Sequence, residues 1–272
     1  MVRINGIKFK DDEFHNGEVI FEKLDLINED LNVIEMNFKD NRDIAAVLFA
    51  RQWLKDKCPN AQCDLVMKYC PYERMDREIN SQLFSMKYFA EILAKFEFDS
   101  VRILDPHSEV CINLLEEQGI KVSIINLEEY VNKVIYEFKP DYIFYPDKGA
   151  AKKYPLVLKN IDIPYFFGAK TRDLENKGRI KSYELVDAPD LKDKKVLIID
   201  DICCLGGTAY NAGEIMKEQG ASQVAFYISH CENGVFAGKI LKEEDGKYVI
   251  DKIYTADTML LDDVHDNITI IK

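Results

Sequence analysis

The chain has 272 residues, 47% of them hydrophobic, and a formal net charge of -12. This length can bury a sizeable core, in two small domains or one large one. The acidic balance disfavours nonspecific nucleic-acid binding, and no apolar run is long enough to span a bilayer. The first residues lack the apolar core of a signal peptide. We therefore expect a cytoplasmic protein that binds neither nucleic acid nor membrane.

Short apolar runs alternate with amphipathic segments along the chain, a pattern typical of a mostly parallel sheet flanked by helices. The expected fold class is α/β. A helix is expected over residues 81–96, with Ser81 available as its N-cap, and another over residues 208–219. Strands are expected over residues 2–9, 64–69, 100–105, 121–126, 141–145, 195–200, 223–229 and 248–254.

A strand, an acidic turn and a helix follow one another near Asp105 and again near Asp201. This repetition predicts two related α/β halves that meet around residues 130–140. We place the boundary between a domain of residues 1–135 and a domain of residues 136–272.

Two arginines and two carboxylates follow the strand expected at residues 64–69. Arg74 could bind a polyphosphate through its fork of N–H donors, although a charged loop is more often solvated surface. His107 lies beside an aspartate after the next expected strand, where open α/β folds bind ligands, although a lone histidine is more often structural. The two stretches read Pro71-Tyr72-Glu73-Arg74-Met75-Asp76-Arg77 and Leu104-Asp105-Pro106-His107-Ser108.

The most informative stretch covers residues 196–208. Four apolar residues lead into Asp200 and Asp201, and a Gly-Gly-Thr turn then opens a helix that closes at Gly220. The N-terminus of such a helix favours an anion, because its N–H groups are unsatisfied and its dipole is positive there. An ordinary strand, turn and capped helix is the alternative, but the compound pattern predicts a site for a phosphorylated sugar. Gly206 and Gly207 let the backbone approach the phosphate.

This stretch resembles the loop that binds phosphoribosyl diphosphate (PRPP) in type I phosphoribosyltransferases and in ribose-phosphate pyrophosphokinases, the PRPP synthetases. The order Pro-Tyr-x-Arg-x-Asp-Arg, helix, strand and Asp-x-His-Ser is similar to the pyrophosphokinases and not to the simple transferases. The resemblance implies two tandem phosphoribosyltransferase-like domains. It also implies Mg²⁺-dependent transfer of diphosphate from ATP to the anomeric hydroxyl of ribose 5-phosphate, giving PRPP and AMP.

Three further stretches extend the resemblance. Residues 14–18 resemble an early Phe-x-Asp-Gly-Glu motif that serves the ATP site of a neighbouring subunit, and their alternative is a hairpin turn. Residues 145–150 resemble a segment whose aspartate lies near metal and ribose 5-phosphate, and their alternative is a strand-ending turn. Residues 168–173 resemble a mobile catalytic loop with a Lys-x-Arg pair, and their alternative is a solvated charged loop. The late stretch Thr255-Ala256-Asp257-Thr258 is similar to the family's Thr-Thr-Asp-Thr segment.

The resemblance assigns roles residue by residue. It implies catalytic roles for Lys170, Arg172 and His107, and metal binding by His107 and Asp147. ATP would bind to Phe14, Asn16, Glu18, Arg74 and Asp76. Ribose 5-phosphate would bind to Asp200, Asp201, Cys204, Leu205, Gly206, Gly207 and Thr208. A homo-oligomer with a shared ATP site is implied as well.

Four positions depart from the family pattern. Cys204 replaces an acidic residue of the PRPP loop and Leu205 replaces a threonine or similar small residue. Asn16 replaces an aspartate and Met75 a glutamine. A neutral thiol neither holds Mg²⁺ nor accepts strongly from a hydroxyl. Cys204 therefore leaves a non-catalytic regulatory subunit open as an alternative function. The PRPP loop alone is also explained by a phosphoribosyltransferase that consumes PRPP, which stays open as well.

Overall fold

The computed structural model describes residues 1–9, 11–24, 27–173, 179–244, 246–260 and 265–272. Two compact units divide the chain, Met1–Ile125 and Asn126–Lys272. The predicted boundary after residue 135 differs from this division, because it would cut through the helix α4 (Leu127–Phe138). Among the described residues, no helix is long and apolar enough to cross a membrane.

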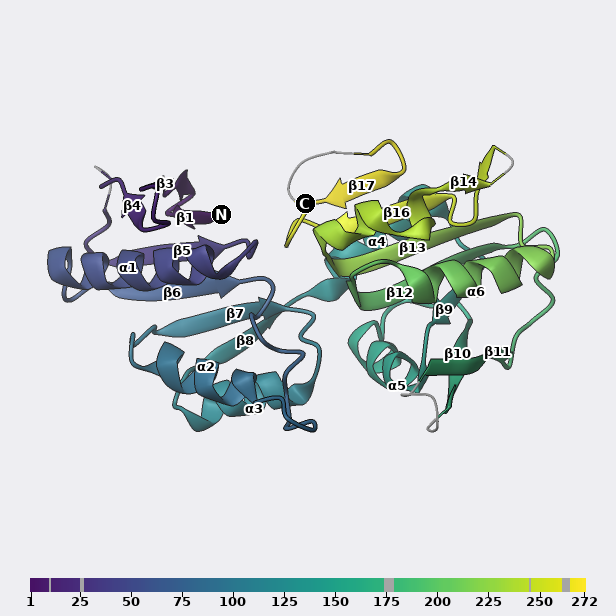
Figure 1. Ribbon diagram of the computed structural model, residues 1–272, viewed down its shortest axis with the longest axis horizontal. Helices are drawn as coiled ribbons and strands as arrows, with labels where there is room; N and C mark the ends of the chain where they lie inside the picture. The colour runs from purple at the N-terminus through teal and green to yellow at the C-terminus, as the bar shows by residue number, and fades with distance from the viewer. Residues whose placement is uncertain (10, 25–26, 174–178, 245, 261–264) are drawn as a thin grey trace. The chain divides into compact units, whose positions relative to one another are not determined.

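The first unit is built on a six-stranded sheet in the order β2-β1-β5-β6-β7-β8 (Figure 1). The last four of these strands run parallel, while β1 is antiparallel to β5. A separate two-stranded hairpin is formed by β3 (Asp11–Glu13) and β4 (Val19–Phe21). The sheet strands are β1 (Val2–Ile4), β2 (Ile7–Lys8), β5 (Leu31–Met36), β6 (Gln62–Met67), β7 (Ser100–Leu104) and β8 (Val122–Ile125), and the helices are α1 (Asn41–Lys57), α2 (Ser85–Ala94) and α3 (Glu109–Glu117).

The second unit is built on a seven-stranded sheet in the order β11-β10-β9-β12-β13-β16-β17, and only the β10–β11 pair is antiparallel. In Figure 1, α6 lies in front of this sheet and α4 behind it, and both contact β13. The strands are β9 (Tyr142–Tyr145), β10 (Tyr165–Asp173), β11 (Arg179–Val186), β12 (Lys195–Cys203), β13 (Gln223–Cys231), β16 (Lys252–Ala256) and β17 (Ile268–Ile271). The remaining elements are α4, α5 (Lys148–Val157), α6 (Gly207–Glu218), the short turns η1 (Asn233–Ala237) and η2 (Lys239–Leu241), and the hairpin β14 (Glu243–Glu244) and β15 (Lys247–Tyr248).

The central strand β12 shows why the apolar runs become buried strands. Its residues Val196, Leu197, Ile198 and Ile199 are all fully buried. A parallel strand covered by helices on both faces has no polar side, so its sequence is continuously apolar and does not alternate. The apolar run ends at Asp200, and the strand itself continues to Cys203. The expected α/β class, with mostly parallel sheets flanked by helices, is confirmed.

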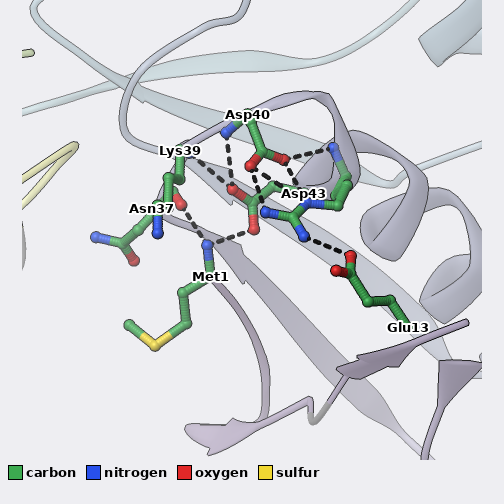
Figure 2. A network of polar contacts seen from close by, with 7 residues as sticks. Met1, Glu13, Asn37, Lys39, Asp40 and Asp43 are labelled. Atoms are coloured by element: carbon green, nitrogen blue, oxygen red, sulfur yellow. Dashed lines mark hydrogen bonds and ion pairs between the residues drawn. The ribbon is translucent and has the colours of Figure 1, made fainter. Parts of the chain in front are cut away.

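A polar network fixes the start of α1 (Figure 2). The Asp40 carboxylate accepts from the backbone N–H of Arg42 at 2.9 Å, and Asp43 completes a capping box. Asp43 also pairs with the amino group of Met1, which joins β1 to the helix. Arg42 bridges to Glu13 of the small hairpin at 2.9 Å. Because such caps satisfy N–H groups that the helix leaves open, the network orients α1 against the sheet.

Several expected elements differ in detail from the structure. The strand expected over residues 248–254 is divided, because β15 ends at Tyr248 and β16 begins at Lys252. Residues 2–9 form the short hairpin β1–β2 and not one strand, because Asn5 and Gly6 adopt positive φ (52° and 79°), as a two-residue turn requires. The helix expected from residue 81 begins at Ser85, and its N-cap position is Phe84, without a side-chain cap. The stretch expected as a charged mobile loop at residues 168–173 belongs to strand β10, paired with β11.

Candidate functional site

Two loops of the first unit meet at the carboxyl ends of β6 and β7, which are neighbouring parallel strands. The backbone N–H of His107 donates to a carboxylate oxygen of Glu73 at 3.3 Å. The Ser108 hydroxyl donates to Asp76 at 2.9 Å. The stretches that contain the predicted residues Arg74, Asp76 and His107 are therefore joined by hydrogen bonds.

The residues of these two loops differ in how exposed their side chains are. The side chains of Arg74 and His107 are exposed, Asp76 is half-buried, and Glu73 is fully buried. Glu73 received no role from the sequence, although a carboxylate among arginines was a usable signal. The ring of Tyr72 packs on Phe89 with centroids 5.5 Å apart, and its hydroxyl donates to Asn41 at 3.0 Å.

The stretch Phe14–Glu18 forms the turn of the β3–β4 hairpin, as its structural alternative expected. The N–H of Phe14 donates to the Glu18 carbonyl at 2.9 Å, and the Asn16 amide donates to the Glu18 carboxylate at 2.8 Å. The Phe14 side chain is 57% exposed.

The predicted ribose 5-phosphate residues lie in one continuous turn at the end of β12. Asp200 and Asp201 are inside the strand, which continues to Cys203, and not beyond its end as expected. The helix α6 begins at Gly207, one residue earlier than predicted, and Gly206 is its N-cap with φ of 74°. The remaining members of the turn follow in order, with Cys204 and Leu205 exposed and Thr208 half-buried in the first turn of the helix.

The η1–η2 segment packs against the backbone of this turn, a contact that was not predicted from the sequence. A Cβ atom added to Gly238 would lie 2.0 Å from the Leu205 carbonyl oxygen, and one added to Gly234 would lie 2.9 Å from the Cys204 carbonyl oxygen. The backbones therefore approach more closely than any side chain would allow. Two glycines four residues apart, just after a buried strand, are the signal that could have indicated this support.

Asp147 lies at the end of β9, the neighbour of β12 in the sheet. One of its carboxylate oxygens accepts from the backbone N–H groups of Gly149 and Ala150, both at 3.0 Å. Asp147 is thus the N-cap of α5, a structural role in addition to the predicted metal binding. Among the described residues, no three histidine, cysteine, aspartate or glutamate side chains form a ready-made metal site.

Lys170 and Arg172 lie on β10, where their Cα partners on β11 are Tyr183 and Ile180. The side chains of both residues lie outside the described part of the structure. Their predicted catalytic roles stay predictions. Lys170 lies beyond the part of β10 that pairs with β9, which ends at Phe167.

Three carboxylates influence one another at the ends of β9 and β12. Burial raises the pKa of Asp200 well above its usual range, and the negative charges of Asp201 and Asp147 raise it further. Ionising Asp200 therefore disfavours the folded state, because the charge loses water and meets two like charges. A bound cation or a hydroxyl donor would relieve that cost. The site is arranged to attract such a group.

Replacing Asp200 with asparagine is expected to stabilise the protein at neutral pH by on the order of 1 kcal/mol. The folded state holds the Asp200 proton more tightly than the unfolded state does, so wild-type stability falls as pH rises above the ordinary aspartate pKa of about 3.9. The difference in free energy of unfolding between the variant and the wild type should increase from pH 4 towards pH 7. Thermal unfolding at several pH values measures it. Parallel curves for the two proteins would contradict the proposed burial of charge.

Known proteins resemble this chain in sequence and in fold. The model of the phosphoribosyl transferase domain family matches residues 113–259. The ribose-phosphate pyrophosphokinase of Thermoplasma acidophilum is 26% identical over 246 residues, which cover 88% of this chain and 82% of that protein. The ribose-phosphate pyrophosphokinase of Campylobacter jejuni is 26% identical over 209 residues, 76% of this chain and 64% of that protein.

The crystal structure of phosphoribosylpyrophosphate synthetase from Mycobacterium smegmatis superposes with a TM-score of 0.73 at 17% identity, covering 97% of this chain and 85% of that one. This likeness confirms the fold over both units. The matched segment of the domain family includes Asp147 and the entire turn after β12. The chain therefore belongs to the phosphoribosyl transferase domain family and, within it, to the family of the ribose-phosphate pyrophosphokinases.

Proposed function

We propose that this protein is a Mg²⁺-dependent ribose-phosphate pyrophosphokinase, which transfers the diphosphate of ATP to the anomeric hydroxyl of ribose 5-phosphate and releases AMP. The observation that carries the proposal is the combination of a glycine-backed anion turn with three interacting carboxylates at the adjacent strand ends. A simple phosphoribosyltransferase would leave the joined loops of Arg74 and His107 in the first unit without a role. The match to pyrophosphokinases extends over 88% of the chain and supports the same choice.

The turn after β12 would bind the 5-phosphate. Gly206 has positive φ and is the N-cap of α6, so the first N–H groups of that helix face the turn. The hydroxyl of Thr208 adds a further donor. Asp200 and Asp201 would accept from the ribose hydroxyls, which orients the sugar with its anomeric carbon towards the diphosphate donor.

Mg²⁺ fits the chemistry of the donors present. It usually keeps several waters and is bound by one or two carboxylates together with substrate phosphates, so a full protein cage is unnecessary. Asp147 of the second unit is the residue proposed to lie near it, and metal binding by the exposed His107 of the first unit stays a prediction from the sequence. When bound, the ion would neutralise the charge of the diphosphate.

The first-unit loops would bind ATP, with Arg74 on the phosphates and Asp76 held in place by Ser108. Lys170 and Arg172 would stabilise the negative charge that gathers on the transferred group. Phe14, Asn16 and Glu18 would serve the ATP site of a second copy of the chain. The exposed Phe14 ring at the tip of a hairpin supports that arrangement.

The assay that tests the proposal incubates the purified protein with ATP, Mg²⁺ and ribose 5-phosphate and follows AMP and PRPP by chromatography. Equal amounts of both products, absent without the sugar, are expected. Neither product, with ribose 5-phosphate binding intact, would overturn the enzymatic proposal. It would favour a regulatory subunit, which the neutral Cys204 in the turn would suit.

Replacing Cys204 with aspartate is expected to lower the KM for ribose 5-phosphate by about 10-fold, because a charged acceptor strengthens a hydrogen bond to a sugar hydroxyl by about 1.5 kcal/mol. Position 204 is exposed, so the carboxylate adds no burial cost. Steady-state kinetics with ribose 5-phosphate measures the change. Cys204→Ser is the matched control and should leave the KM close to the wild-type value. Activity in the aspartate variant but none in the wild type would support the regulatory alternative.

A further inference from the structure

The side chain of Tyr183 connects the outermost strand of the second unit's sheet to the candidate site. Tyr183 belongs to β11, the edge strand, which pairs with β10. Its hydroxyl crosses β10 and donates to the backbone carbonyl of Pro146 at 2.9 Å. Pro146 follows the end of β9, so a single side chain ties together three successive strands of the sheet.

Gly168 of β10 makes this crossing possible. A Cβ atom at this position would lie 2.3 Å from the Tyr183 hydroxyl oxygen and 2.7 Å from the Pro146 carbonyl oxygen. The phenol therefore lies directly over the glycine backbone, an arrangement in which an aromatic ring covers a glycine of the neighbouring strand. Gly168 has an ordinary φ, so the space above it, and not its backbone freedom, is what the position requires.

The hydrogen bond from Tyr183 to Pro146 lies next to the carboxylates of the site. Pro146 immediately precedes Asp147, whose carboxylate caps α5. Burial raises the pKa of Tyr183, and the charges of Asp147 and Asp200 raise it further. The hydroxyl lies on the carbonyl of Pro146, the residue before Asp147, which places it next to the carboxylates by geometry. At neutral pH it stays protonated and remains a donor.

The register adds a second connection. Tyr183 is the direct Cα partner of Lys170, the predicted catalytic lysine. A shift of the β10–β11 hairpin relative to β9 would therefore move the backbone of Lys170 relative to Asp147. Strand pairing between β9 and β10 covers only Tyr165, Phe166 and Phe167 on β10. Beyond Phe167, the hydroxyl of Tyr183 supplies a further link between the hairpin and the end of β9.

We propose that Tyr183 is a positioning residue, whose hydroxyl fixes the β10–β11 hairpin against the Pro146–Asp147 backbone and so sets Lys170 relative to the carboxylates. The inference rests on the proposed pyrophosphokinase function. It adds to that function a residue that touches neither substrate. Phenylalanine at this position keeps the ring over Gly168 and removes only the donor.

The test compares Tyr183→Phe with Tyr254→Phe. Tyr254 lies on β16 in the same unit and donates to Glu137 at 3.0 Å, so the control removes a similar hydrogen bond away from the site. For Tyr183→Phe we expect kcat to fall by about 10–100-fold and the KM for ribose 5-phosphate to change by less than about 3-fold. Tyr254→Phe should keep the wild-type kcat. An unchanged kcat in Tyr183→Phe would overturn the proposal, and so would an equal loss in both variants.

Hydrogen exchange separates this proposal from the function on which it rests. In Tyr183→Phe, the amides of residues 147–151 and 166–169 should exchange faster than in the wild type and in Tyr254→Phe, whether or not the wild type makes PRPP. Faster exchange together with an inactive wild type would support the structural role of the Tyr183–Pro146 hydrogen bond and contradict the proposed pyrophosphokinase activity. Unchanged exchange would contradict the proposed structural role of the Tyr183–Pro146 hydrogen bond.

Discussion

Replacing Gly206 with alanine is expected to destabilise the protein and to weaken ribose 5-phosphate binding at least about 100-fold, because the turn after β12 cannot keep its shape. Gly206 has φ of 74°, a conformation that costs an L-residue about 1–2 kcal/mol. Its new Cβ would lie 2.7 Å from the Cγ2 atom of Ile240, which is buried. Overpacking of that kind adds about 1–3 kcal/mol.

Gly207→Ala is the matched control for folding. Gly207 is the next residue in the chain, has no positive φ, and has open space where its Cβ would be. Thermal unfolding should therefore show a large loss of stability for the Gly206 variant and little change for the Gly207 variant. Isothermal titration with ribose 5-phosphate measures the affinity. Wild-type stability and affinity in Gly206→Ala would show that the turn does not depend on this conformation.

Replacing Lys170 with alanine is expected to reduce kcat by about 10²–10³-fold while changing the KM for ribose 5-phosphate by less than about 3-fold. A lysine that stabilises the transferred diphosphate acts mainly in the transition state. The sugar phosphate, by contrast, would be bound by the turn after β12. Steady-state formation of AMP and PRPP measures both parameters.

Lys152→Ala provides the control for this substitution. Lys152 is an exposed lysine of α5, so its removal changes the net charge equally without touching β10. Its kinetics should match those of the wild type. If Lys170→Ala kept the wild-type kcat, the lysine would have no role in the transfer.

The fold could be predicted where the physics is local to a few residues. Continuously apolar runs such as Val196–Ile199 mark buried parallel strands, and their spacing gave the α/β class. The hairpin at Asn5-Gly6 and the helix α1 were missed, although an Asn-Gly pair and the box of Asp40 and Asp43 are recognisable signals. Residues 168–173 were expected as a loop and belong to strand β10, because a charged stretch is also typical of a solvated loop.

The residues of the candidate site could be predicted from the sequence, but the long-range contacts that hold them in place could not. Asp200 and the glycines of the turn follow from a strand that leads into a helix. The contacts of Gly238 with Leu205 and of Tyr183 with Pro146 join residues more than thirty positions apart. Such pairs depend on how strands are ordered in the sheet, and one sequence does not reveal that order.

The close approach of Gly234 and Gly238 to the turn has an evolutionary consequence. Both glycines approach the carbonyl oxygens of Cys204 and Leu205, while the Leu205 side chain is 54% exposed. At Leu205 the shape of the turn is thus determined by main-chain packing that does not involve the side chain at this position. Mutations there can accumulate without unfolding the loop, and natural variation could retune the affinity for the sugar at little structural risk.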